Sequence, residues 1–128
     1  MSASVGVCLV AGVLVTQLGN TVTLAWTHSI EKIRWEEDYR REGNALRLVE
    51  ARVRGTGAGM EPPAGAVLKA GAWHYTPALP PLPGIRLTHS PYVPDYVVCS
   101  AGTCQSIAAW LPGLPEQGVI ELVPCAGD

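Results

Sequence analysis

The sequence predicts a single all-β domain over residues 1–128, built as a small barrel or a sandwich of mostly antiparallel strands. Apolar and polar residues alternate over short stretches, and these stretches are bounded by Gly, Pro or Asn. The 14 glycines and 11 prolines also favour many short elements over a few long ones. The expected strands are Val5–Ala11, Leu14–Leu18, Thr21–His28, Glu31–Arg40, Leu46–Arg54, Ala66–Leu68, Trp73–Thr76, Ile85–His89, Tyr96–Cys99, Cys104–Ile107 and Val119–Val123.

The first two strands lie in the apolar run Val5–Val15. This run is too short to span a bilayer, and no Lys or Arg precedes it. We therefore interpret it as part of the fold and not as an export or membrane segment. A signal sequence that was removed or replaced remains an alternative.

The segment from Ser29 to Gly43 is the one place where a long helix competes with a strand. It is rich in helix formers, and Ser29 could cap a helix that ends at Gly43. However, Ile33, Trp35 and Tyr39 share one parity of a strand, with Glu37 between them. We favour the strand, with its charged residues on the solvated side of a hairpin.

Two later segments complete the predicted order. Residues 76–85 contain four prolines and are expected to form an extended connector between two halves of the domain. Near the C-terminus, the stretch before Pro112 is compatible with a single helical turn or a strand end. We therefore expect at most one short helical turn in this region.

The four cysteines predict two disulfides. Cys99 and Cys104 flank a turn that contains Gly102, a spacing that suits a bond across a tight hairpin. Cys8 and Cys125 then remain, and a bond between them would join the first strand to the last. Other pairings, or four reduced cysteines in a cytosolic domain, are the alternatives.

Charge and motifs exclude several classes of function. The net charge of −2 gives no electrostatic basis for binding nucleic acid or an anionic membrane surface. The glycine-rich stretch 55–65 fits neither a dinucleotide-binding nor a P-loop pattern, so no cofactor is predicted. Nucleophile-elbow and H-E-x-x-H motifs are absent from the sequence, which favours a non-enzymatic protein.

The triplet Thr-His-Ser occurs twice, at residues 27–29 and 88–90. His28 shares a strand face with Val22, Leu24 and Trp26, and His89 shares one with Ile85 and Leu87. The apolar parity changes after His28, which requires a bulge or a bend between Ser29 and Lys32. A bulge before Glu31 would bring it to the same side as His28, while His74 lies opposite Trp73 and Tyr75.

This pattern suggests a candidate site of His28, Glu31 and His89. Imidazole and carboxylate groups could bind a small-molecule ligand or coordinate a divalent metal, although the spacing alone does not identify a metal. A metal-dependent or acid–base enzyme using these residues is the alternative to a binding protein. The simpler interpretation is a partly buried histidine that is oriented by a glutamate.

The glycine-rich stretch 55–65 is a second candidate, as a loop at the mouth of a pocket. Arg52, Arg54 and Glu61 would then form its polar rim. Glycines that permit positive φ or close backbone approach explain the same composition without a ligand.

The stretches "THSIEKIRWEEDYR" and "LVEARVRGTGAGMEPP", together with the second Thr-His-Ser, resemble the family catalogued as domain of unknown function 1850. The resemblance covers most of the chain. It implies a genomic context, because members are often encoded beside permeases of TAXI-type tripartite ATP-independent periplasmic (TRAP) transporters. We therefore expect a periplasmic or periplasm-facing accessory domain whose partner is a transporter permease or solute-binding protein.

Overall fold

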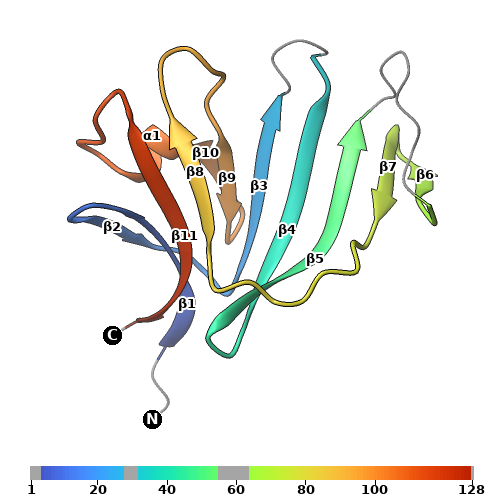
Figure 1. Cartoon of the computed structure of the whole chain (residues 1–128), viewed down its shortest axis with the longest axis horizontal. Coiled ribbons are helices and arrows are strands. Elements are labelled where there is room, and N and C mark those ends of the chain that lie inside the picture. The colour runs from blue at the N-terminus through green and yellow to red at the C-terminus, as the bar shows by residue number, and fades with distance from the viewer. Residues whose placement is uncertain (1–3, 28–31, 55–63, 128) are drawn as a thin grey trace.

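The computed structural model describes residues 4–27, 32–54 and 64–127 and forms a sandwich of two antiparallel sheets, not a closed barrel (Figure 1). The smaller sheet has the order β2-β1-β11-β8, and the larger has the order β10-β9-β3-β4-β5-β7-β6. The elements are β1 (Ser4–Ala11), β2 (Leu14–Gln17), β3 (Thr21–Thr27), β4 (Arg34–Glu42), β5 (Ala45–Arg54), β6 (Val67–Lys69), β7 (Ala72–Tyr75), β8 (Ile85–His89), β9 (Val97–Ser100), β10 (Thr103–Ser106), α1 (Ile107–Trp110) and β11 (Gly118–Gly127).

Each predicted strand is present, including β4, where a helix was the alternative. On β4 the side chains of Trp35, Glu37 and Tyr39 point to the inner face, which faces the smaller sheet, while Glu36 and Asp38 point outward. Both faces find partners, with apolar residues on one side and arginines on the other. A strand satisfies this alternation and a helix would not.

The change of parity after His28 arises because β3 and β4 are two arms of a hairpin. Trp26 pairs with Trp35 and Thr27 with Arg34, so the chain reverses between them. Lys32 has a positive φ of 61° on the approach to β4, and residues 28–31, where most of the expected bulge or bend falls, lie outside the described part. A register shift does occur, but between β4 and β5. There Val49 is an extra residue of β5 opposite Asp38 and Tyr39 of β4, which is a β-bulge.

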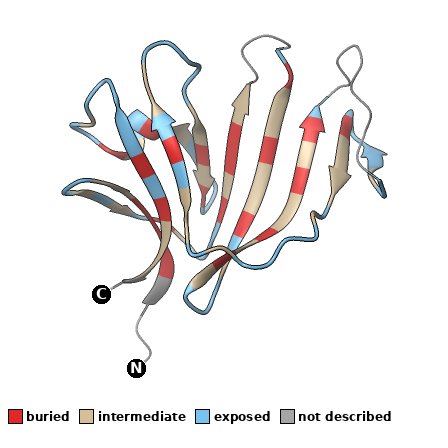
Figure 2. Ribbon diagram, viewed as in Figure 1, coloured by how far each residue is buried: buried red, intermediate tan, exposed pale blue. Residues whose placement is uncertain are grey.

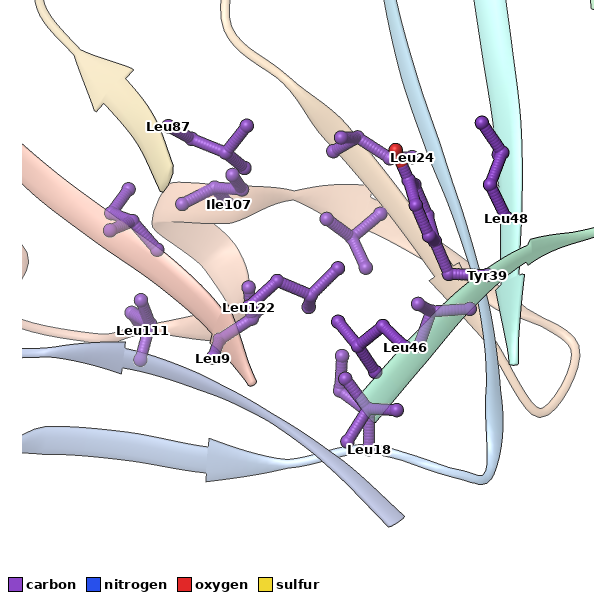
Figure 3. Packing of buried hydrophobic residues seen from close by; sticks show 14 residues of the cluster. Leu9, Leu18, Leu24, Tyr39, Leu46, Leu48, Leu87, Ile107, Leu111 and Leu122 are labelled. Carbon is purple, nitrogen blue, oxygen red and sulfur yellow. The ribbon is translucent and has the colours of Figure 1, made fainter. Parts of the chain in front are cut away.

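The core lies between the two sheets, where buried residues recur as bands along the facing strands (Figure 2). Figure 3 shows leucines from both sheets, Ile107 from α1 and Tyr39 as members of one packed cluster. Burying one such leucine contributes roughly 1.5–3 kcal/mol of transfer free energy. The cluster comprises Val7, Leu9, Leu18, Val22, Leu24, Tyr39, Leu46, Leu48, Leu87, Val98, Ile107, Leu111, Ile120 and Leu122.

The two sheets are joined at one end by the chain crossing from β2 to β3 and by the side chain of Arg41. The amide of Leu18 donates to the carbonyl of Val7 at 2.7 Å where the chain crosses from β2 towards β3. Gly6 lies so close to this crossing that a Cβ would stand 2.7 Å from the carbonyl oxygen of Leu18. The guanidinium of Arg41 on β4 donates to the carbonyls of Gly6 and Cys125, which ties the larger sheet to both β1 and β11.

The proline-rich connector and the C-terminal turn agree with expectation. Leu82 in the connector exchanges two backbone hydrogen bonds with Leu46, at 2.7 and 2.8 Å. The short helix α1 begins after Ser106, whose hydroxyl accepts a hydrogen bond from the amide of Ala109. No helix in the described ranges is long and apolar enough to cross a membrane.

Both expected disulfides are present, Cys99–Cys104 and Cys8–Cys125. Cys99 and Cys104 are directly paired residues of β9 and β10, and their Cα atoms are 4.0 Å apart. Cys8 and Cys125 lie on the neighbouring strands β1 and β11 with their Cα atoms 5.9 Å apart. The second bond therefore joins strands from the two ends of the chain.

Candidate functional site

The structure describes only some of the residues that were predicted to form a site. His28, Glu31 and Glu61 lie outside the described residues. His89 lies at the end of β8 on the same face as Leu87, as predicted. Its Nδ1 is 3.4 Å from a carboxylate oxygen of Asp95, and its side chain is 15 % exposed. No sequence pattern indicated the contact between His89 and Asp95, because the two residues are brought together by a loop.

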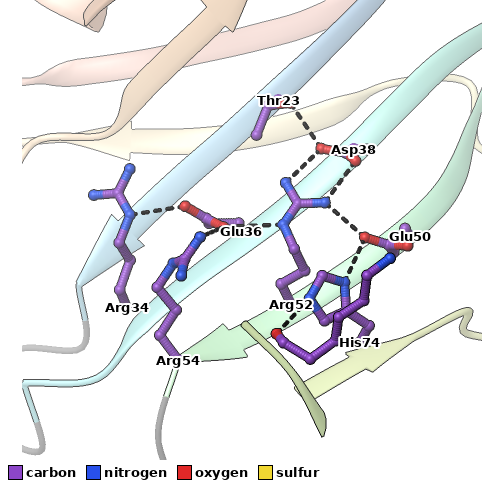
Figure 4. A network of polar contacts seen from close by, with 9 residues as sticks. Thr23, Arg34, Glu36, Asp38, Glu50, Arg52, Arg54 and His74 are labelled. Carbon is purple, nitrogen blue, oxygen red and sulfur yellow. Dashed lines mark hydrogen bonds and ion pairs between the residues drawn. The ribbon is translucent and has the colours of Figure 1, made fainter. Parts of the chain in front are cut away.

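Arg52 lies elsewhere, on the outer face of the larger sheet (Figure 4). Its guanidinium contacts Glu36 at 2.9 Å, Asp38 at 2.7 Å and Glu50 at 2.8 Å. The structure therefore does not bring Arg52 together with His89, which faces the core side of the other sheet. In the described structure Arg52 is the centre of an ion-pair network between strands.

The network also takes in His74, which pairs with Glu50 at 3.0 Å on the outer face, opposite Trp73 and Tyr75 as predicted. Burial raises the pKa of Glu36, but hydrogen bonds from Arg34 and Arg52 outweigh burial and leave that pKa below its ordinary value. The hydrogen bond with Asp38 is the main cause of a raised pKa at Arg52, so this residue stays charged. With opposite charges satisfied in this way, the network is suited to holding strands together.

The inner face of the same sheet has a different chemistry. Trp26 and Trp35 stack with ring centroids 6.3 Å apart and planes 9° from parallel. Tyr96 lies 6.0 Å from Trp26 at an angle of 58°. On the same face the hydroxyl of Tyr39 donates a 2.7 Å hydrogen bond to Glu37. An aromatic cluster with a half-buried carboxylate therefore occupies the inner face beside the core.

A recess of about 270 Å³ opens beside this cluster, between the ends of β3 and β8 and the loop that follows β8. Its lining combines aromatic rings, proline and valine with two threonines and one serine. A second hollow of about 340 Å³ lies on the outer face near the Cys99–Cys104 bond and is lined mainly by short or polar side chains. The lining of the first recess is Trp26, Thr27, Thr88, Ser90, Val93, Pro94 and Tyr96.

The recess has the features of a small-molecule site, which combines apolar walls with a few polar groups. Its position touches both Thr-His-Ser triplets, through Thr27 and through Thr88 and Ser90. The described lining thus includes Thr27, Thr88 and Ser90 of the two triplets and does not include His89. Among the residues that the structure describes, no group of three His, Cys, Asp or Glu side chains is arranged to hold a metal ion.

A family model described as domain of unknown function (DUF1850) matches residues 22–107. The chain belongs to this family. The DUF1850 match begins within β3 and ends at the first residue of α1, so it contains both walls of the recess and the whole outer-face network. No curated protein and no solved structure matches the chain.

Proposed function

We propose that this chain is a non-enzymatic, ligand-binding accessory domain that works in the periplasm beside a TRAP-type solute transporter. The recess between the ends of β3 and β8 carries the binding part of the proposal. Its lining combines the stacked ring of Trp26 and the ring of Tyr96 with the polar residues Thr88 and Ser90. Such a wall can hold the apolar part of a small solute and still orient its polar atoms.

The disulfides support the proposed compartment. All four cysteines are paired, and disulfides form and persist in oxidising compartments such as the bacterial periplasm. The transporter as partner rests on what the resemblance to the DUF1850 family implies, namely that members are often encoded beside permeases of TAXI-type TRAP transporters. A domain that binds a solute in the same compartment could assist delivery to the permease or contact the solute-binding protein.

The test is quantitative crosslinking mass spectrometry on the tagged chain expressed from its own locus in the native host. We expect the permease or solute-binding protein of a TRAP transporter to be enriched over an untagged strain. Intact mass measured without reductant, with a thiol-alkylating reagent added to whole cells, should show two disulfides and no alkylated cysteine. Absence of any transporter subunit, or four alkylated thiols, would contradict the proposal.

The recess itself is tested by a matched pair of tyrosine variants. Tyr96→Leu removes a wall of the recess, whereas Tyr92→Leu alters a tyrosine that is 84 % exposed and does not line it. Native mass spectrometry of protein isolated from the host should find a small molecule bound to the wild type and to Tyr92→Leu, and absent from Tyr96→Leu. Equal retention by both variants would place the ligand elsewhere.

A further inference from the structure

The inference concerns the charge of the ligand, and it rests on the proposed binding function. The inner face of the larger sheet extends beyond the smaller sheet, so that β5, β7 and β6 spread away from it in Figure 1. Near this boundary β3, β4 and β7 each carry an inner-facing tryptophan. Trp26 pairs with Trp35 across β3 and β4, and Trp73 pairs with Val53 across β7 and β5.

Glu37 lies within this aromatic surface. On its own strand it is flanked by Trp35 and Tyr39 on the same face, and the Tyr39 hydroxyl donates to its carboxylate at 2.7 Å. Across the strands it pairs with Leu24 on β3 and Ala51 on β5. Both cross-strand neighbours are apolar, so the carboxylate is the polar group of an otherwise hydrophobic and aromatic surface.

The charge of Glu37 reaches two further rings. Burial is the main cause of a raised pKa at Tyr75 and at Tyr96, and the negative charge of Glu37 is the second cause at both. The strand register gives the geometric counterpart: Glu37 pairs with Leu24 and Trp35 pairs with Trp26, so Glu37 lies diagonally across from Trp26 on the inner face. Because Trp26 lines the recess, this carboxylate is a diagonal neighbour of one of its walls.

The arginines of the sheet do not neutralise this charge. Arg34, Arg52 and Arg54 are all engaged with acidic residues of the outer face. Within residues 4–27, 32–54 and 64–127, no Lys, Arg or His forms an ion pair with Glu37. The described lining of the recess also contains no basic side chain.

Aromatic ring faces carry negative electrostatic potential and attract cations, most strongly when water is excluded, and trimethylated ammonium groups are bound in this way by aromatic cages. An anionic solute would instead meet the repulsion of Glu37 and the ring faces of Trp26 and Tyr96. We propose that the recess binds a small organic cation of the alkylated ammonium class, with the cationic group against Trp26 and Tyr96 and within reach of the Glu37 carboxylate. Thr88 and Ser90 also line the recess and would border the rest of the ligand.

The decisive comparison uses two probes of the same shape that differ in charge. Choline and 3,3-dimethylbutan-1-ol share a hydroxyl and three methyl groups, but only choline carries a positive charge. Titration of the purified, disulfide-bonded chain by calorimetry and tryptophan fluorescence should show choline binding at least about tenfold more tightly than the neutral probe, which is the ratio expected from one or two cation–aromatic contacts. This comparison needs no variant, so it holds even where a substitution impairs folding.

The residue assignment is tested with Glu37→Gln, which removes the charge and keeps the size. We expect this variant to lose roughly tenfold in choline affinity and to leave binding of the neutral probe unchanged, because only choline interacts with the charge. Glu121→Gln, which alters an exposed glutamate on β11, is the matched control and should bind both probes as the wild type does.

Three results would overturn the inference: equal affinity for the two probes, tighter binding of the neutral probe, or no choline binding at millimolar concentration. A solute found bound to the native protein that is neutral or anionic would also overturn it, while leaving the proposed binding function intact. Failure of the proposed function has a separate signature, because it is judged by enrichment of transporter subunits and by the Tyr96→Leu and Tyr92→Leu pair.

Discussion

Removing the Cys8–Cys125 bond should destabilise the protein far more than removing the Cys99–Cys104 bond. The two crosslinks are separated by 117 and 5 residues along the chain, respectively. In the chain-entropy model a disulfide stabilises the fold by restricting the unfolded chain, and the effect grows with the logarithm of the loop length. These separations correspond to about 5 kcal/mol for the long loop and about 2 kcal/mol for the short one.

The structure adds a reason for the same order. Cys99 and Cys104 lie in a hairpin whose turn contains Ala101 and Gly102, both with positive φ, so a short local turn already brings them together. Cys8 is 5 % exposed and joins strands that the chain must bring together from its two ends. Replacement by alanine therefore also removes a buried sulfur at Cys8, which adds to the loss.

The assay is equilibrium urea unfolding of the wild type and of two double variants, Cys8→Ala with Cys125→Ala and Cys99→Ala with Cys104→Ala. The free energy of unfolding should fall by about 5 and about 2 kcal/mol, respectively. Tryptophan fluorescence and circular dichroism should give coincident transitions, which makes the comparison legitimate. Equal losses, or a larger loss for the hairpin bond, would refute the loop-length reasoning.

Three further predictions concern stability and are measured by the same urea unfolding assay. Gly6→Ala should cost about 2 kcal/mol because its Cβ meets a backbone oxygen at 2.7 Å, whereas Gly118→Ala, with open space around it, should be close to neutral; equal effects would show that the crossing strands can yield. Leu122→Ala should cost about 3 kcal/mol, against less than about 0.5 kcal/mol for Val119→Ala, which is 50 % exposed; similar losses would contradict the assigned core. Arg52→Met should cost about 3 kcal/mol at neutral pH because it leaves three carboxylates without their shared partner. Those carboxylates have lowered pKa values, so their contribution is complete above the unfolded values near about 4 and is lost as pH falls through the folded values; the wild type should therefore lose more stability than the variant between about pH 5 and 2, and parallel pH profiles would exclude this linkage.

Local pattern predicted the strands well because a β-strand alternates its side chains with a period of two. The same parity placed Trp35 and Tyr39 together, and it separated His74 from its aromatic neighbours, as the structure confirms. The cysteine pairing was also accessible, since one pair spans a turn and leaves the other pair for the chain ends. These inferences needed only neighbours in sequence or a process of elimination.

Contacts between side chains on different strands were harder to predict from the sequence. From the sequence we expected the charged residues of β4 to form a solvated surface. In the structure, pairing with β5 places Arg52 among Glu36, Asp38 and Glu50. A part of this network is visible in the sequence, because the acidic residues that alternate along β4 and the arginines that alternate along β5 each lie on one face of their strand. Its meaning depended on the register between strands, including the shift at Val49 that no local pattern reveals.

The candidate site shows the same division. The sequence alone determined that two Thr-His-Ser triplets end strands whose inner faces are apolar, and it determined the parity of Glu37 between Trp35 and Tyr39. Only the tertiary structure decided that β3 and β8, which belong to different sheets, end beside one recess, and that Glu37 lies diagonally across from Trp26 in the lining of that recess. The physical reason is that side-chain parity follows from the local backbone, whereas strand order follows from the burial of a shared core by residues far apart in the chain.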